Sequence, residues 1–245
     1  QIEAMGANQI FVRGKDPDLA ESDKNKALSK GLTVEDGLAM AKIPGILAIS
    51  PEGRGFDQMR YGDYAFDGNA MLVLPGYSRV HNRIPQRGRF LTQDDLERGA
   101  KVCVLRKSAG PTKRQWWMRD DPISKIFARG DPLGQSLIIG GVPYKIVGII
   151  EDEKQEEGQL VNVYWGGWRE VVFVPFTAYW HRHQRQDNVW QINAQLASSD
   201  AVETVVDDVS QLLLHRHGGI KDFEISTMKE ILAETFKMMG MFNMV

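Results

Sequence analysis

Two strand–helix–strand patterns, one near each end of the chain, constrain the fold more than any other feature of this sequence. Residues 8–51 predict a strand, a helix and a second strand. Thr33 can cap the helix, Asp36 stands three residues later as a capping box requires, and Pro44 with the glycine after it marks the end of the helix. Two such units that pair form a split βαβ, ferredoxin-like layer, so the pattern predicts an α+β fold.

The second pattern occupies residues 188–226 and repeats the first in order and length. An alternating strand precedes a helix for which Asp200 and Glu203 are spaced as a capping pair. Apolar residues recur at helical spacing along one face of this helix: Val202, Val205, Val206, Val209, Leu212 and Leu213. Gly218 and Gly219 end the helix before the return strand. The repeat is architectural, without clear identity between the residues of the two units.

The region between these patterns, residues 52–187, is rich in short β-type runs and turns. Its clearest element is a hairpin in GQSLIIGGVPYKIVGII, where Gly140 and Gly141 form a two-residue turn between two β-rich runs. The sequence thus predicts a discontinuous α/β subdomain of residues 1–51 and 188–233. A small β-rich subdomain, residues 52–187, is inserted into it.

Composition and motifs exclude several classes of function. The chain of 245 residues has a formal net charge of -2, which offers no electrostatic case for binding nucleic acid or acidic lipid. No phosphate loop of the form G-x-x-x-x-G-K-[ST] occurs, so the chain is not expected to hydrolyse ATP. The single cysteine, Cys103, lies in a strand-like run and is expected to be a buried structural thiol. With no Ser-His-Asp or Cys-His arrangement, we expect no catalytic residue, cofactor or metal.

Two histidines raise an alternative hypothesis in which the chain binds a metal. In YWHRHQRQD, His181 and His183 would share a face on a strand, whereas His183 and Asp187 would share a face on a helix. A zinc site needs three or four convergent ligands, and a solvated polar segment explains these residues without a metal. The alternative left open is a soluble small-ligand-binding protein or a metal-dependent enzyme that uses His181 and His183.

Two tryptophan-rich segments are candidates for a partner interface. The first, TKRQWWMRD, contains Trp116, Trp117 and Arg119, and the second, YWGGW, contains Trp165 and Trp168. Such residues are enriched at protein interfaces and at the membrane–water boundary, and they can also stack on nucleobases or pack in a core. We favour a protein interface, because the net charge gives nucleic acid no support.

The last predicted helix loses its polar face toward the end of the chain. Thr227 and Glu230 have the spacing of a capping box, and apolar residues follow on one face. After Lys237 the polar face disappears, because MMGMFNMV is apolar almost all round. A helix of this kind is either docked on the core or enters lipid, and we favour residues 234–245 as the start of a helix directed into a membrane. No run in the sequence reaches the ~18 apolar residues of a complete span.

Six stretches occur in a specific order and spacing that covers most of the chain. They are IEAMGANQIFVRG, LTVEDGLAMAKIPGILAISP, RGRFLTQDDLERGAKVCVL, DPLGQSLIIGGVPYKIVGII, VVFVPF and DAVETVVDDVSQLLLHRHGGIKDFEISTMKEIL. Together they resemble the periplasmic core domain of MacB-like ABC transporter permeases. Two long segments, 111–130 and 151–169, depart from the family pattern and leave the partner and the substrate open.

The resemblance implies a porter-like α/β subdomain with an inserted β-rich subdomain, placed between the first two membrane helices of a permease in the bacterial inner membrane. The domain would be periplasmic and non-catalytic, with ATP hydrolysed by a separate nucleotide-binding domain on the cytoplasmic side. The permease would be a homodimer that exports a macrolide-, peptide- or lipoprotein-like substrate. Partners would include a periplasmic adaptor protein and an outer-membrane duct, but no nucleic acid. A permease that signals to a cell-wall enzyme is a variant of this hypothesis.

Overall fold

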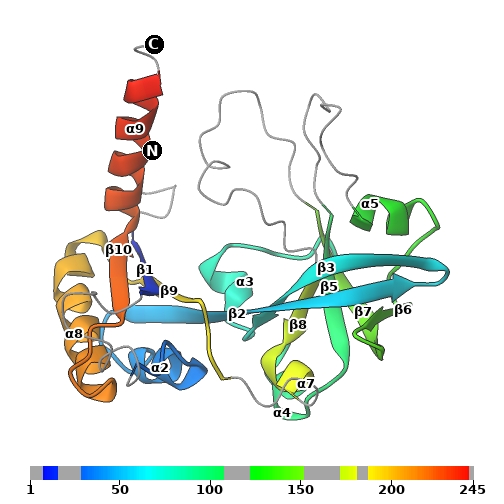
Figure 1. The fold of residues 1–245 in the computed structure, drawn as a ribbon, viewed down its shortest axis with the longest axis horizontal. Helices are drawn as coiled ribbons and strands as arrows, with labels where there is room; N and C mark the ends of the chain where they lie inside the picture. The colour runs from blue at the N-terminus through cyan, green and yellow to red at the C-terminus, as the bar shows by residue number, and fades with distance from the viewer. Residues whose placement is uncertain (1–7, 16–28, 108–121, 152–171, 181–186, 243–245) are drawn as a thin grey trace. The chain divides into compact units, whose positions relative to one another are not determined.

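In the computed structural model, the chain forms two units (Figure 1). The first unit combines Gln1–Gly53 with Asp187–Val245, and the second unit is Arg54–Gln186. The structure describes residues 8–15, 29–107, 122–151, 172–180 and 187–242.

The strands of the first unit form an antiparallel sheet with the order β10-β1-β9-β2. The strand β9 separates β1 from β2, and β1 separates β9 from β10, so each βαβ unit is split by a strand of the other. This is the ferredoxin-like order, and the predicted α+β fold is confirmed. The elements of this unit are β1 (Gln9–Gly14), α2 (Val34–Met40), the start of β2 (Ile46–Tyr61), β9 (Gln191–Leu196), α8 (Val202–Arg216), β10 (Phe223–Thr227) and α9 (Met228–Phe242).

One face of this sheet forms a hydrophobic core with the helices. Ile10 and Val12 of β1 are fully buried, as are Ile192 and Leu196 of β9. The helix α8 packs against β1, β10 and α2. It buries three residues of its predicted apolar stripe: Val205, Val209 and Leu213. Burial of each such side chain stabilises the unit by roughly 1.5–3 kcal/mol.

The helix α2 begins where the sequence predicts and ends earlier than predicted. Thr33 and Asp36 form the capping box, with each side chain accepting the other residue's backbone N–H. The helix ends at Met40 rather than at Pro44. Residues 41–45 form a turn in which Gly45 adopts a φ of 93°, a conformation that favours glycine. This turn redirects the chain into β2.

The predicted cap of α8 is wrong. Asp200 and Glu203 do not cap the helix; instead the hydroxyl of Ser198 accepts a hydrogen bond from the backbone N–H of Asp200 at 3.1 Å. This contact starts a short 3-10 turn, and α8 begins after Ala201, which makes no side-chain capping bond. Serine is as good a cap as aspartate, so the first available cap along the chain takes the role.

The opposite face of the sheet is polar and buried. Glu52 is fully buried, and its carboxylate accepts hydrogen bonds from Gln191 Nε2 at 3.0 Å and Asn193 Nδ2 at 2.7 Å. A buried carboxylate is tolerated only where donors of this kind satisfy it. The polar residues that alternate along β9 therefore have a structural role.

The second unit is a mixed sheet with short helices. Its strand order is β2-β3-β8-β5-β7-β4, with β6 beside β2 and β7. The pairs β3–β8 and β5–β7 are parallel. The elements are the end of β2, β3 (Tyr64–Val73), α3 (Tyr77–Val80), β4 (Arg87–Gly88), α4 (Gln93–Glu97), β5 (Val102–Lys107), α5 (Pro122–Phe127), β6 (Ser136–Ile139), β7 (Val142–Glu151), β8 (Val172–Pro175) and α7 (Phe176–Trp180). The predicted β-rich insertion is confirmed.

Two local predictions for this unit are also confirmed. Gly140 and Gly141 join β6 to β7 with φ values of 54° and 85°, the left-handed pair that a tight hairpin requires. Cys103 is fully buried in β5, and this burial raises the pKa of its thiol far above the usual value. The thiol is therefore structural.

The strand β2 continues well beyond the predicted end at residue 51. It runs through Gly55 to Tyr61, and its second half belongs to the second unit. A side chain at Gly55 would lie 2.3 Å from the hydroxyl oxygen of Tyr179, whose O–H donates to Asp57 at 2.6 Å. The glycine is thus required by close packing.

Gly148 lies where two backbones of the second unit approach each other closely, and its substitution tests the packing there. A Cβ at Gly148 would lie 2.1 Å from the carbonyl oxygen of Arg89. We expect Gly148→Ala to lower the free energy of unfolding by about 2 kcal/mol or more, because the strand pair must shift. Urea unfolding of the chain measures this loss.

The matched control is Gly14→Ala, because no atom lies within 4 Å of a Cβ at Gly14. This change should leave the unfolding curve close to that of the unmodified chain. Equal effects of the two substitutions would contradict the assignment of Gly148 to a steric role.

Candidate functional site

The start of β1 and the start of α9 lie side by side in the first unit (Figure 1). In the antiparallel pair β1–β10, Ile10 is opposite Thr227 and Gly14 is opposite Phe223. The first residues of β1 therefore meet the last residues of β10. The helix α9 follows β10 directly at Met228 and contacts both strands. We call this place, from Asn8 to Ile10 and from Thr227 to Glu230, the β1–α9 junction.

Hydrogen bonds hold both segments of the β1–α9 junction. Asn8 donates from Nδ2 to the carbonyl oxygen of Leu196 at 2.7 Å, and the Leu196 N–H donates back to Asn8 O at 2.8 Å. On the other segment, Thr227 N donates to Glu230 Oε2 at 2.7 Å, and Glu230 N donates to Thr227 Oγ1 at 3.2 Å. The predicted capping box is confirmed, and it sets the direction in which α9 leaves the sheet.

The helix α9 meets the sheet near its first turn. Ile231 is buried, whereas Lys229, Glu230 and Glu234 are exposed. The backbone is helical to Phe242. None of the helices in the described parts of the chain is both long enough and apolar enough to span a membrane. The role of residues 234–245 as the start of a membrane helix stays a prediction.

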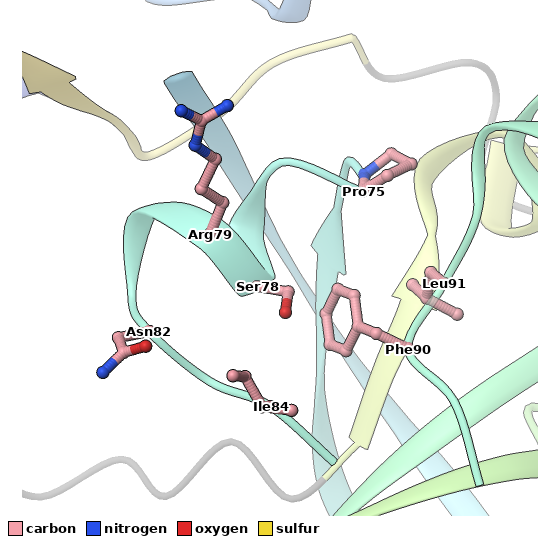
Figure 2. A pocket seen from close by; sticks show the side chains of 7 residues that line it. All are labelled: Pro75, Ser78, Arg79, Asn82, Ile84, Phe90 and Leu91. Carbon is pink, nitrogen blue, oxygen red and sulfur yellow. The ribbon is translucent and has the colours of Figure 1, made fainter. Parts of the chain in front are cut away.

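A groove in the second unit is the other candidate site. It has a volume of about 480 Å³ and is lined by Pro75, Ser78, Arg79, Asn82, Ile84, Phe90 and Leu91. Figure 2 shows Ser78 and Phe90 close to the space, with Arg79 directed away from it. Phe90 and Leu91 are buried, and Ile84 is 68% exposed. No contact among the described residues identifies an occupant, so we assign the groove no role.

An ion pair holds the chain beside this groove. Arg89 donates from Nη1 to Asp95 Oδ2 at 2.5 Å and to the carbonyl oxygen of Phe90 at 3.0 Å. Asp95 also accepts the N–H of Thr92 at 2.8 Å, in the capping box of α4. Burial alone would raise the pKa of Asp95, but the hydrogen bonds from Arg89 and Thr92 outweigh it and place the pKa below its ordinary value.

The residues that the sequence predicted as a partner interface lie outside the described parts of the chain. These are Trp116, Trp117, Arg119, Trp165 and Trp168. His181 and His183 of the alternative metal site also lie outside them. No cluster of metal-binding side chains occurs among the residues that are described. The interface therefore stays a prediction.

The family model described as "MacB-like periplasmic core domain" matches residues 1–212. The chain belongs to this family. The resemblance found in the sequence is thereby confirmed, and the comparisons give no support to the alternative that uses His181 and His183.

Relatives of this MacB-like domain are export proteins that combine ATP-binding and permease functions. The macrolide export ATP-binding/permease protein MacB of Azoarcus sp. (strain BH72) is 26% identical over 233 residues, which are 95% of this chain and 32% of the relative. The pyoverdine export ATP-binding/permease protein PvdT of Pseudomonas savastanoi pv. phaseolicola is 23% identical over 92% of this chain and 31% of its own. The chain thus spans about a third of the length of these relatives.

Solved structures share the fold of the MacB-like domain. The periplasmic region of MacB from Actinobacillus actinomycetemcomitans superposes with a TM-score of 0.71 at 18% identity and covers 97% of this chain and 96% of that one. The extracellular domain of the noncanonic ABC-type transporter YknZ from Gram-positive bacteria has a TM-score of 0.68 at 19% identity, over 90% of this chain and 100% of that one. At these identities the likeness establishes the fold alone.

The Arg89–Asp95 ion pair predicts how the second unit responds to acid. In Arg89→Gln, Asp95 keeps its burial but loses its charged partner, so its pKa rises. A carboxylate whose pKa is lower in the folded state than in the unfolded state stabilises the folded chain at pH values above the unfolded-state pKa. This stabilisation is lost as the pH falls through the folded-state pKa. The contribution of Arg89 is present only while Asp95 is ionised, so the stability lost in the variant should be largest at neutral pH and should shrink as the pH falls through the folded-state pKa of Asp95. At pH 7 we expect a loss of about 1 kcal/mol, because Arg89 is half exposed and solvent screens the pair.

Urea unfolding between pH 3 and pH 7 measures this effect. Arg98→Gln is the matched control, because Arg98 Nε and Asp94 Oδ1 form an ion pair at 2.7 Å in which both side chains are exposed to solvent. It should follow the unmodified chain at every pH. An Arg89→Gln chain with the same acid dependence as the control would contradict the assigned role of the pair.

Proposed function

We propose that this chain is the non-catalytic extracytoplasmic domain of an ABC transporter permease and that it converts movement of membrane helices into movement of a periplasmic assembly. Membership of the MacB-like family supports this proposal, as do relatives named as ATP-binding/permease proteins. ATP would be bound and hydrolysed by a nucleotide-binding domain on the cytoplasmic side. The chain itself contains no phosphate loop.

The single observation that carries the proposal is the geometry of the β1–α9 junction. A domain inserted between two membrane helices must receive the chain and return it at the same place. Ile10 lies opposite Thr227, and α9 starts one residue later. A displacement of either flanking helix would therefore act directly on β1 and β10, which are hydrogen-bonded to one another.

The parts of the domain would have different tasks. Residues 1–51 with 188–233 would be a porter-like subdomain near the bacterial inner membrane, and 234–245 would begin the second membrane helix. The insertion, 52–187, would meet partners in the periplasm, among them an adaptor protein that leads to an outer-membrane duct. The permease would work as a homodimer, with two domains that alternate between open and closed arrangements.

The tryptophan-rich segments are the proposed contact points with such a partner. Trp116, Trp117 and Arg119 lie in one segment, and Trp165 and Trp168 lie in the other. Tryptophan and arginine contribute more to interfaces than most residues. The substrate would be a macrolide-, peptide- or lipoprotein-like molecule, in keeping with relatives named for macrolide or pyoverdine export.

A flexible insertion at the β1–α9 junction tests the coupling in the full-length transporter. Three glycines between Thr227 and Met228 replace a stiff connection by a flexible one. We expect ATP hydrolysis by the purified transporter to persist, and export, measured as drug resistance of cells that express the transporter, to fall to the level of cells that lack it.

The matched control places the same three glycines after Gly62, in the exposed turn between β2 and β3. This variant should retain export. Full export by the junction variant, at the same amount of protein in the membrane, would overturn the proposed transmission of movement.

A further inference from the structure

Two adjacent glycines lie in the turn between α8 and β10. Gly218 and Gly219 have φ values of 65° and 84°, and no atom lies within 4 Å of a Cβ at either position. The N–H of Gly219 donates to the carbonyl oxygen of Leu214 at 2.7 Å and closes the end of the helix. Because glycine has more backbone freedom than any other residue, this turn (residues 218–221) alone would not fix the angle between α8 and β10. We call it the glycine turn.

A buried side-chain contact bridges the glycine turn. His217 precedes the glycines at the end of α8, and Asp222 follows the turn and precedes β10. Nδ1 of His217 contacts Oδ1 of Asp222, and the two side chains are 4% and 0% exposed. Phe223, the first residue of β10, is also buried and packs edge-on against the ring of His217, with 5.9 Å between the ring centroids. Side chains therefore join the start of β10 to the end of α8.

Asp222 also binds the segment that leads into α2. Its Oδ2 accepts a hydrogen bond from Ser29 Oγ at 2.6 Å and one from the N–H of Gly31 at 3.3 Å. Its backbone carbonyl oxygen accepts the N–H of Lys15, the residue after β1, at 2.8 Å. The two oxygens of a single carboxyl group thus have different partners, one at the end of α8 and the other before α2. Such contacts are costly to break, because a buried acceptor that loses its donor stays out of contact with water.

The contacts continue from His217 into the first turn of α2. Nε2 of His217 lies 3.2 Å from Oδ2 of Asp36, and Nε of Arg216 donates to Oδ1 of Asp36 at 2.5 Å. Asp36 in turn forms the capping box of α2 with Thr33. A closely packed interior transmits displacement between such neighbours. A movement of Asp222 would therefore act on α8 and on α2 together.

The sheet itself holds β10 on one side only. In the described parts of the chain, β10 is a strand of five residues whose one strand neighbour is β1. Phe223 is buried, whereas the residues after it in the strand are partly or fully exposed. The strand continues directly into α9 (Figure 1). An edge strand with so few buried side chains opens more easily than a central one. The attachment of Asp222 at its start adds a hold that the β-ladder does not supply.

We propose that Asp222 is a latch across the glycine turn. Through its contacts with His217, Ser29 and Gly31 it fixes the β10–α9 arm, residues 223–242, to α8 and α2. When these contacts are removed, β10 opens from β1 while the rest of the first unit stays folded. The part that the latch plays in transport rests on the proposed function: a displacement of α9 would move α8 and α2 together with β10, and Asp222 would be a positioning residue for that movement.

Hydrogen exchange of the backbone amides in the 245-residue chain tests the latch. In Asp222→Ala, local opening of β10 no longer breaks the contacts of the carboxyl group. We therefore expect the amides of β10 to exchange at least about tenfold faster than in the unmodified chain. Lys221→Ala changes the exposed neighbouring side chain and should leave these rates unchanged.

A second control separates the latch from a general loss of stability. Ile192 is fully buried in β9, so Ile192→Val and Ile192→Ala weaken the same sheet in two steps without a change at Asp222. Urea unfolding identifies which of the two matches the stability of Asp222→Ala more closely. Relative to that variant, the amides of β10 in Asp222→Ala should still exchange faster. Equal rates in β10 would mean that Asp222 acts on overall stability alone, and they would overturn the proposal.

Ser29→Ala keeps the test decisive if Asp222→Ala does not fold. It removes one of the hydrogen bonds to Oδ2 and leaves the carboxyl group of Asp222 in place. The amides of β10 in Ser29→Ala should exchange faster than in Ile192→Val, although by a smaller factor than the loss of the whole latch would give. Exchange in β10 that is the same in these two variants would contradict the latch.

The full-length transporter tests the role of the latch in transmission. In Asp222→Ala, export should fall toward the level of cells that lack the transporter, while ATP hydrolysis and the amount of protein in the membrane persist. Lys221→Ala should retain export. Full export by Asp222→Ala, in a transporter that the glycine insertion at the β1–α9 junction inactivates, would overturn transmission through the latch. If that insertion leaves export intact, the proposed function itself fails, and hydrogen exchange still decides whether the latch exists.

Discussion

The fold of the first unit depends on the pairing of β1 with β9 on one side and with β10 on the other. Ile10 and Val12 of this strand are fully buried, and the same residues set the register with Thr227 and Ile225 across the sheet. Because β1 is antiparallel to β10, the start of β1 and the start of α9 are neighbours. The β1–α9 junction follows from this pairing alone, and the proposed mechanical role follows from the junction.

Buried charges add a second constraint, and each one is matched by donors. Glu52 lies between the amides of Gln191 and Asn193, and Asp36 serves at once as the cap of α2 and as the partner of Arg216. Removing one member of a buried charged group costs more than the group contributes, because the other member stays buried. These contacts therefore select one arrangement of helices and strands.

Predictions that rest on neighbouring residues were successful. The capping boxes of α2 and α9 need only a threonine and a carboxylate three residues apart, and the hairpin needs only Gly140 and Gly141. The errors arose where several local signals compete or where a distant residue decides. Ser198 precedes Asp200 and caps the 3-10 turn before α8. The strand β2 continues past residue 51, and Gly55 in it leaves room for the distant Tyr179.

The two βαβ patterns, the cap of α2, the β-rich insertion and the lack of a phosphate loop can be predicted from the amino-acid sequence, because each depends on the type and spacing of residues along the chain. Three features are evident only in three dimensions: β1 lies between β9 and β10, Asp36 and Asp222 meet at His217, and Arg89 holds Asp95 beside a groove. These contacts join residues that are brought together by the crossing of the chain. Their partners leave no periodic signal in the sequence, since any one of many polar side chains could have filled each place.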